Sequence, residues 1–232
     1  MGFFVRRVIV LAEHGLIEAV EAAHFLLWRK LSVVGDIVNG FMFRVPRNFH
    51  PFDAGHVAIE VSKTLERGAC LYMRTSGDSP ADAYFDEPAN AGRVAEALCV
   101  GAGFTGVDTV LDTFADMDRG YFTRSGLVDR RYNPKLGSRV VANLIALLNN
   151  GNWRTSGPAI SEGGLRVCTL EQPGGEALSL IHEGDGETAR KMTPTIQEHL
   201  GRGKVFDLST GLVVQDPSVL PPEPFLFALT TE

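Results

Sequence analysis

Strand-like and helix-like segments alternate over the first 150 residues, and this alternation limits the fold more than any other feature of the sequence. β-rich apolar runs occupy residues 6–15, 35–45, 69–77 and 106–117. Helical segments occupy residues 16–31, 54–68, 87–103 and 136–148. Parallel strands need a crossover, which is usually a helix, so four such units predict a parallel sheet covered by helices. We expect this sheet to hold in adjacent strands Ile9, Val38, Leu71 and Val110.

The pattern changes after Gly151. Pairs of short apolar runs surround the turn sequences QPGGE (172–176) and STG (209–211), which is typical of antiparallel strands. A short helix is expected around residues 195–200. The fold class is therefore α/β, with a βα-repeat domain over residues 1–150 and a β-rich domain over residues 151–232. We expect the second domain to pack on the helix that ends near Asn149.

Composition and charge exclude several kinds of partner. With 44% hydrophobic and 22% charged residues, the chain has the make-up of a globular protein with a sizeable core. Its net charge of -6 and its lack of a Lys/Arg-rich block argue against nucleic-acid binding. The cysteines, Cys70, Cys99 and Cys168, lie far apart without a CxxC pair. We therefore expect reduced, buried thiols, with no metal and no cofactor.

The N-terminal apolar run is too short for a membrane span. Glu13 and His14 interrupt it after about seven residues, no cleavage-site pattern follows, and no segment reaches the roughly 18 apolar residues that a span needs. We interpret it as a core strand. We expect no membrane partner and a soluble, cytoplasmic protein, unless an N-terminal segment of an exported protein has been removed.

Several motifs occur in an order that resembles one group of enzymes. LYMRTSG (71–77) precedes GVDTVLDTFADMDRGYF (106–122), GLVDRRYNPKLGSRVVANLIALL (126–148), and a β-rich tail with VFDLSTG and PPEPFLFAL. This order is similar to the C-terminal half of retaining glycoside hydrolases of the clan A type, which combine a (β/α)8 barrel with a small β-sandwich. The resemblance runs from about Asp36 to the end. It implies a partial barrel and a carbohydrate ligand.

The resemblance also indicates which catalytic groups to look for. Retaining hydrolysis needs two carboxylates about 5 Å apart, which these enzymes carry at the ends of their fourth and seventh strands. Thr75 stands where the resemblance expects the nucleophilic Glu, and Asp78 is the only nearby carboxylate. No strand matches the fourth one, unless Glu13 plays that part. The candidate catalytic residues are therefore Glu13 and Asp78.

The loop DTFADMDRGYFTRSG (112–126) is the richest polar segment. Its Asp and Arg side chains can orient hydroxyls, and Tyr121 can stack on a sugar face. The candidate substrate-binding residues are Thr75, Asp112, Asp116, Tyr121 and Arg124. A solvated salt-bridge loop is the plainer interpretation of the same residues. For His50 and His56 we expect helix capping or packing rather than metal ligation.

Three classes of function remain open. The first is a glycoside hydrolase-like protein that acts on or binds carbohydrate, either a degenerate member without the nucleophilic Glu or a fragment that is complete only if another chain or a missing segment supplies the first half of the barrel. The second is a non-catalytic relative, a scaffold or interaction protein, which Thr75 favours. The third is an unrelated α/β enzyme that uses the loop from Asp112 to Arg124. Under the first two, the open edges of a half barrel predict self-association or a partner chain that completes the barrel.

Overall fold

The computed structural model of the protein describes residues 9–13, 40–45, 49–75, 87–118, 123–149, 151–183, 193–201, 203–218 and 226–231. These residues form an α/β fold with a four-stranded parallel sheet, a layer of helices, a seven-stranded antiparallel sheet and a separate two-stranded hairpin. The predicted helix over residues 16–31 lies outside the described residues.

The parallel sheet contains four strands in the described residues: β1 (Ile9–Glu13), β2 (Gly40–Val45), β3 (Gly68–Arg74) and β4 (Val107–Asp112). Their spatial order is β1-β2-β3-β4, and all three pairings are parallel. Ile9, Leu71 and Val110 lie in β1, β3 and β4, as predicted, while Val38 lies outside the described residues. These strands do not close into a full barrel.

Three helices cover one face of this sheet: α3 (Pro51–Leu65), α4 (Glu87–Gly103) and α5 (Leu136–Leu148). α4 and α5 have the predicted bounds. We expected α3 to end at Gly68, and that was wrong. Glu66 adopts the left-handed conformation (φ 51°) and its N–H bonds Ser62, so the helix stops there and Gly68 begins β3 instead.

The antiparallel sheet follows α5. Its strands are β7 (Arg154–Thr155), β8 (Ile160–Glu162), β9 (Leu165–Glu171), β10 (Ala177–Glu183), β11 (Gly203–Asp207), β12 (Leu212–Val213) and β13 (Leu226–Thr231). They run in the order β12-β11-β13-β10-β9-β7, with β8 paired to β9. The prediction of a β-rich segment after Gly151 is confirmed. So is the short helix, α6 (Pro194–Leu200), which Thr193 caps.

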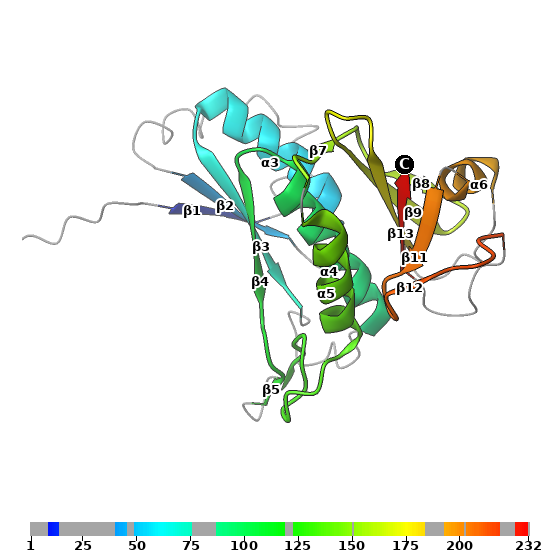
Figure 1. Ribbon diagram of the computed structural model, residues 1–232. Helices are drawn as coiled ribbons and strands as arrows, with labels where there is room; N and C mark the ends of the chain where they lie inside the picture. The colour runs from blue at the N-terminus through cyan, green and yellow to red at the C-terminus, as the bar shows by residue number, and fades with distance from the viewer. Residues whose placement is uncertain are drawn as a thin grey trace, which may run out of the picture.

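The helices α3, α4 and α5 lie between the two sheets (Figure 1). α4 is therefore buried on nearly all sides, and one continuous apolar cluster runs from Phe41 in β2 through Ala95 in α4 to Leu180 in β10. α5 also contacts the tail, as predicted, since the Asn143 amide donates to the Leu208 carbonyl at 2.9 Å. α6 covers the opposite face of the antiparallel sheet. Among the helices of the described residues, none has the length and the apolar run that crossing a bilayer would require.

Candidate functional site

The carboxyl ends of β3 and β4 meet at one edge of the parallel sheet, where Arg74 pairs in register with Asp112. Parallel α/β proteins place their sites at this edge, in the loops that follow the strands. Here the loop after β4 contains a small hairpin, β5 (Met117–Asp118) and β6 (Thr123–Arg124). This edge carries Thr75, Asp112 and Asp116 from the residues that the sequence indicated.

Thr75 follows β3 directly and is fully buried. Its hydroxyl donates to the Ser125 carbonyl at 2.6 Å and accepts the Thr113 N–H at 3.1 Å. Its own N–H donates to the Asp112 carbonyl at 2.6 Å. Thr75 thus links the end of β3 to Thr113 and Ser125, which lie near the start and the end of the loop after β4. All these partners of its hydroxyl are backbone groups.

The carboxylates of Asp112 and Asp116 form further hydrogen bonds at the same sheet edge. Asp112 accepts hydrogen bonds from the Tyr72 hydroxyl and, at 3.0 Å, from the Thr113 hydroxyl, and its carboxylate lies 4.0 Å from Arg74 Nε. Asp116 accepts the Gly126 N–H at 2.6 Å.

Lys135 links Asp116 to the residues around Thr75. Its Nζ lies 3.1 Å from Asp116 Oδ1 and donates to Ser125 Oγ at 2.6 Å. Ser125 in turn accepts the Thr75 hydroxyl through its carbonyl. The structure therefore brings together Thr75, Asp112 and Asp116.

Sequence reasoning missed four polar partners at this edge: Tyr72, Arg74, Ser125 and Lys135. Lys135 lies in the segment GLVDRRYNPKLGSRVVANLIALL (126–148), but its hydrogen bond to Ser125 and its ion pair with Asp116 were not predicted. The remaining candidates are placed only in part. Glu13 ends β1 and Arg124 lies in β6, but the structure does not describe their side chains. Asp78 and Tyr121 lie outside the described residues.

Two aromatic side chains are exposed on the segments that form this edge. Phe114, 64% exposed, follows β4, and Tyr132, 72% exposed, lies in the turn before α5. The segment at Phe114 is joined to the segment before that turn, because Leu127 N–H donates to the Phe114 carbonyl at 2.8 Å. Asp129 organises the turn by accepting two N–H groups and the Asn133 amide. The bond from Asn133 lowers the pKa of Asp129.

A second polar cluster is buried between α4 and the antiparallel sheet. Glu96 Oε1 accepts from Arg166 Nε at 2.9 Å and lies 2.8 Å from His182 Nε2, while Oε2 accepts the Phe52 N–H at 3.0 Å. Arg166 also bonds Asp53 at 3.1 Å. Burial by itself raises the pKa of Glu96, but the hydrogen bonds from the histidines and the charge of Arg166 outweigh burial and hold this pKa well below its usual range.

His50 belongs to the same cluster. We expected it to cap α3 or to pack, and it does occupy the position before the helix without a side-chain capping bond. Its Nδ1 lies 3.2 Å from Glu96 Oε1, a contact that the sequence did not indicate. His56 does pack, with its ring edge-on to Phe52 and Phe104 and its Nε2 at 2.9 Å from the Gly157 carbonyl.

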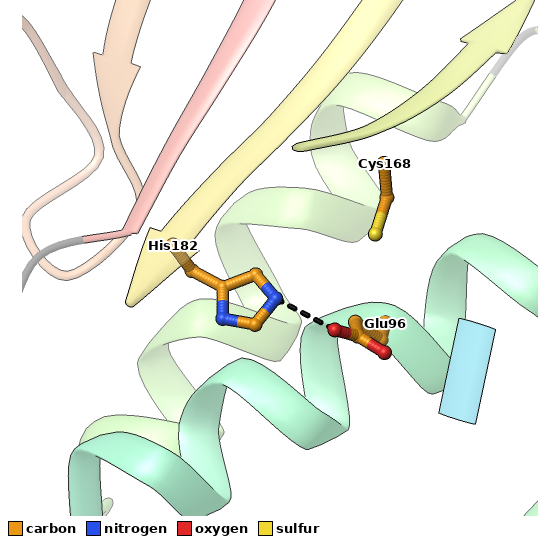
Figure 2. A group of neighbouring side chains, drawn as sticks. All are labelled: Glu96, Cys168 and His182. Atoms are coloured by element: carbon orange, nitrogen blue, oxygen red, sulfur yellow. Dashed lines mark hydrogen bonds and ion pairs between the residues drawn. The ribbon is translucent and has the colours of Figure 1, made fainter. Parts of the chain in front are cut away.

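Cys168 completes this group on the α4-facing side of β9. One donor atom each from Glu96, Cys168 and His182 lie within 4.8 Å of one another, and all three side chains are buried (Figure 2). Burial raises the pKa of the Cys168 thiol well above its usual value. Sequence reasoning missed this group, although a Glu inside the Ala-rich helix segment RVAEALCV is a local sign of a buried partner.

Comparisons with known proteins give distant structural similarities. No family model matches the chain, and neither does any curated protein. A family 39 glycoside hydrolase from Bacteroides cellulosilyticus WH2 is similar with a TM-score of 0.46 and 12% identity over 93% of this chain and 45% of that one. A GH27 β-L-arabinopyranosidase from Geobacillus stearothermophilus gives a TM-score of 0.31 at 13% identity, over 91% of this chain and 62% of that one.

A third similarity is to an α-amylase from Lactobacillus plantarum, with a TM-score of 0.30 at 12% identity over 90% of this chain and 66% of that one. The chain thus spans less than two thirds of the length of each of these proteins. These likenesses carry no activity over to this chain.

Proposed function

We propose that this chain binds carbohydrate at the carboxyl ends of β3 and β4. The observation that carries the proposal is the gathering of Asp112, Asp116 and Lys135 at one sheet edge, on the same segments as the exposed Phe114 and Tyr132. Carboxylates and ammonium groups bond sugar hydroxyls, and exposed rings offer flat apolar surface to a sugar face. In this proposal Tyr121 and Arg124, from the same loop, also face the ligand.

The proposal treats residues 1–150 as part of a (β/α)8 barrel and residues 151–232 as a small β-sandwich. Its support is the run of parallel βα units and the antiparallel tail, in the order that the motif resemblance implies. Thr75 acts indirectly in this scheme. Its buried hydroxyl bonds Ser125 and Thr113, so it fixes the loop that carries the binding groups.

We further propose that the chain is a poor hydrolase. Thr75 stands where the motif resemblance expects the nucleophilic carboxylate, and within the described residues its hydroxyl bonds backbone groups rather than a base that could activate it. Without that group no covalent intermediate divides the reaction into two easier steps. Glu13 and Asp78 remain the candidate catalytic carboxylates.

Binding is tested by affinity electrophoresis through gels that contain a panel of polysaccharides. The wild-type chain is expected to be retarded by at least one of them. Phe114→Ala and Tyr132→Ala should each weaken retardation about threefold to tenfold, the range expected for losing one aromatic contact. Leu212→Ala is the matched control, since Leu212 is 68% exposed but lies in β12 of the other sheet. Retardation by none of the polysaccharides contradicts the proposal.

Catalysis is tested with a panel of aryl glycosides. We expect turnover close to the uncatalysed rate. Robust turnover that survives both Thr75→Ala and Asp78→Ala would show that the site is misplaced. Turnover lost in Asp78→Ala alone would identify Asp78 as the displaced catalytic group.

An interaction role is the second candidate, and one observation favours it. β1 and β4 form the two edges of the described parallel sheet, and Val110 in β4 is 42% exposed. Open edges invite pairing with another chain, either a second copy or a partner that completes the barrel. Sedimentation equilibrium tests self-association, and a monomer across the concentration range would count against a second copy. An unrelated α/β enzyme that uses the loop from Asp112 to Arg124 would instead show turnover with non-sugar substrates.

A further inference from the structure

The buried cluster around Glu96 has the donor chemistry of a transition-metal site. Its three converging atoms are a carboxylate oxygen from α4, a thiol sulfur from β9 and an imidazole nitrogen from β10 (Figure 2). These ligand types suit zinc, whereas calcium and magnesium prefer oxygen alone. His50 offers a fourth donor, with its Nδ1 at 3.2 Å from the same carboxylate oxygen.

The contacts of His182 direct its Nε2 towards Glu96 Oε1. Nδ1 is 2.7 Å from the Glu183 carbonyl and Nε2 is 2.8 Å from Glu96 Oε1, so both ring nitrogens face acceptors. If Nδ1 donates its hydrogen to the carbonyl, the lone pair of Nε2 faces an anionic oxygen. A proton on Nε2 or a metal ion bound by both atoms removes this repulsion.

The arrangement around the ligands matches the usual surroundings of a metal. A metal-bound histidine almost always donates its other ring N–H to a carbonyl or carboxylate, as His182 does to Glu183. Metal-bound carboxylates are themselves hydrogen-bonded, and Arg166 Nε supplies such a bond to Glu96 at 2.9 Å. These outer contacts orient the His182 ring and the Glu96 carboxylate.

The charge of the cluster accommodates a divalent cation. Two carboxylates, Glu96 and Asp53, pair with the single guanidinium of Arg166. Binding of a divalent ion displaces the proton of the Cys168 thiol to solvent, and the resulting thiolate offsets one of the two added charges. The other added charge offsets the carboxylate that the single Arg166 leaves unbalanced.

From these observations we propose that Glu96, Cys168 and His182 bind a zinc-class divalent cation, with His50 as the fourth donor. The ligands come from α4, β9, β10 and the residue before α3, so the ion would join the helix layer to the antiparallel sheet. This role is structural and does not depend on the carbohydrate site. Cysteine spacing did not reveal it because only one ligand is a cysteine and the ligands are far apart in sequence.

The test is a Co²⁺ titration of the full chain after chelator treatment, followed by absorption spectroscopy. We expect one Co²⁺ per chain, a near-ultraviolet band from thiolate-to-cobalt charge transfer, and loss of the band on adding Zn²⁺. Cys168→Ser should abolish the band, and His182→Gln should weaken binding by tenfold or more. Cys70→Ser is the matched control and should leave the spectrum unchanged, because Cys70 lies in β3 of the other sheet.

The wild-type measurement decides the question even if the buried variants fail to fold. Sub-stoichiometric binding, or binding without the thiolate band, would overturn the proposal and leave a hydrogen-bonded ion-pair cluster without a metal. A band that persists in a folded Cys168→Ser variant, judged by circular dichroism, would overturn it as well. A band that Cys70→Ser retains and Zn²⁺ removes supports it.

Discussion

Glu96 and His182 lie 86 residues apart in the sequence, and their side chains meet at 2.8 Å between α4 and the antiparallel sheet. The same carboxylate accepts Arg166 from β9 and the backbone N–H of Phe52 in the first turn of α3. One fully buried side chain therefore connects two helices and two strands. Such a carboxylate is stable only while its partners compensate its lost hydration.

The first prediction is that Glu96→Gln destabilises the protein strongly. The substitution keeps the volume but leaves the buried Arg166 and His182 without their shared anion, which should cost about 3–5 kcal/mol of unfolding free energy. Urea unfolding in the presence of a chelator measures this. Glu60→Gln is the control, because Glu60 is 66% exposed in its pair with Lys63 and its loss should stay within about 0.5 kcal/mol. Similar losses in both variants would contradict the prediction.

The elements of this fold were predictable because their signals are local. The spacing of apolar residues placed α4 and α5, and each of the four β-rich runs overlaps one strand of the described parallel sheet, β1 to β4. The Glu96 cluster was not predictable in the same way. Its members become neighbours only when α4 packs on β9 and β10, and no spacing rule encodes that contact.

The candidate carbohydrate site was predictable in part. Strand ends and polar loop residues indicated Thr75, Asp112 and Asp116, and the structure places them at one edge. The sequence could not show that the Thr75 hydroxyl is buried. Its partners are Thr113, which follows β4, and Ser125, which lies further along the loop after β4. Residue types therefore indicated where the candidate site lies, but the role of Thr75 follows only from its packing in the structure.

The second prediction concerns Thr75. Thr75→Val keeps the shape but removes the acceptor for the buried Thr113 N–H, so it should cost about 1–3 kcal/mol of unfolding free energy. Thr75→Ser retains the hydroxyl and should lose clearly less. Chemical denaturation of the two variants gives both values. Equal losses in Val and Ser variants would show that the methyl group, and not the hydroxyl, holds the loop.

The third prediction concerns the close approach of α4 to the antiparallel sheet. A Cβ at Gly103 would lie 2.4 Å from Leu170 Cδ2 and 3.3 Å from the Thr155 nitrogen, and Leu170 is fully buried, so its displacement would disturb the surrounding core. Gly103→Ala should therefore destabilise by about 1–3 kcal/mol, although helix propensity alone favours Ala. Gly174→Ala is the control, since nothing lies within 4 Å of its Cβ position. A stabilised Gly103→Ala protein in thermal unfolding would contradict this packing.

The fourth prediction concerns pH and the turn before α5. The hydrogen bond from the Asn133 side chain is the main cause that lowers the pKa of Asp129, with further bonds from the backbone N–H groups of Asn133 and Arg131. A folded pKa below the unfolded one means that the contribution of Asp129 to stability is fully present above its ordinary value of about 3.9. It is lost as pH falls through the lower, folded value.

Asn133→Ala should accordingly raise the pKa of Asp129 towards its ordinary value, because the largest stabilising bond to the ionised carboxylate disappears. A titration of the carboxyl carbons by NMR measures it. Asp216, whose pKa is lowered by Ser218 in a separate turn, serves as the internal control and should not change. If the two aspartates shifted together, or if Asp129 did not respond, the pKa of Asp129 would have a cause other than the bond to Asn133. In that case the side chain of Asn133 would not hold the turn that displays Tyr132 beside the proposed carbohydrate site.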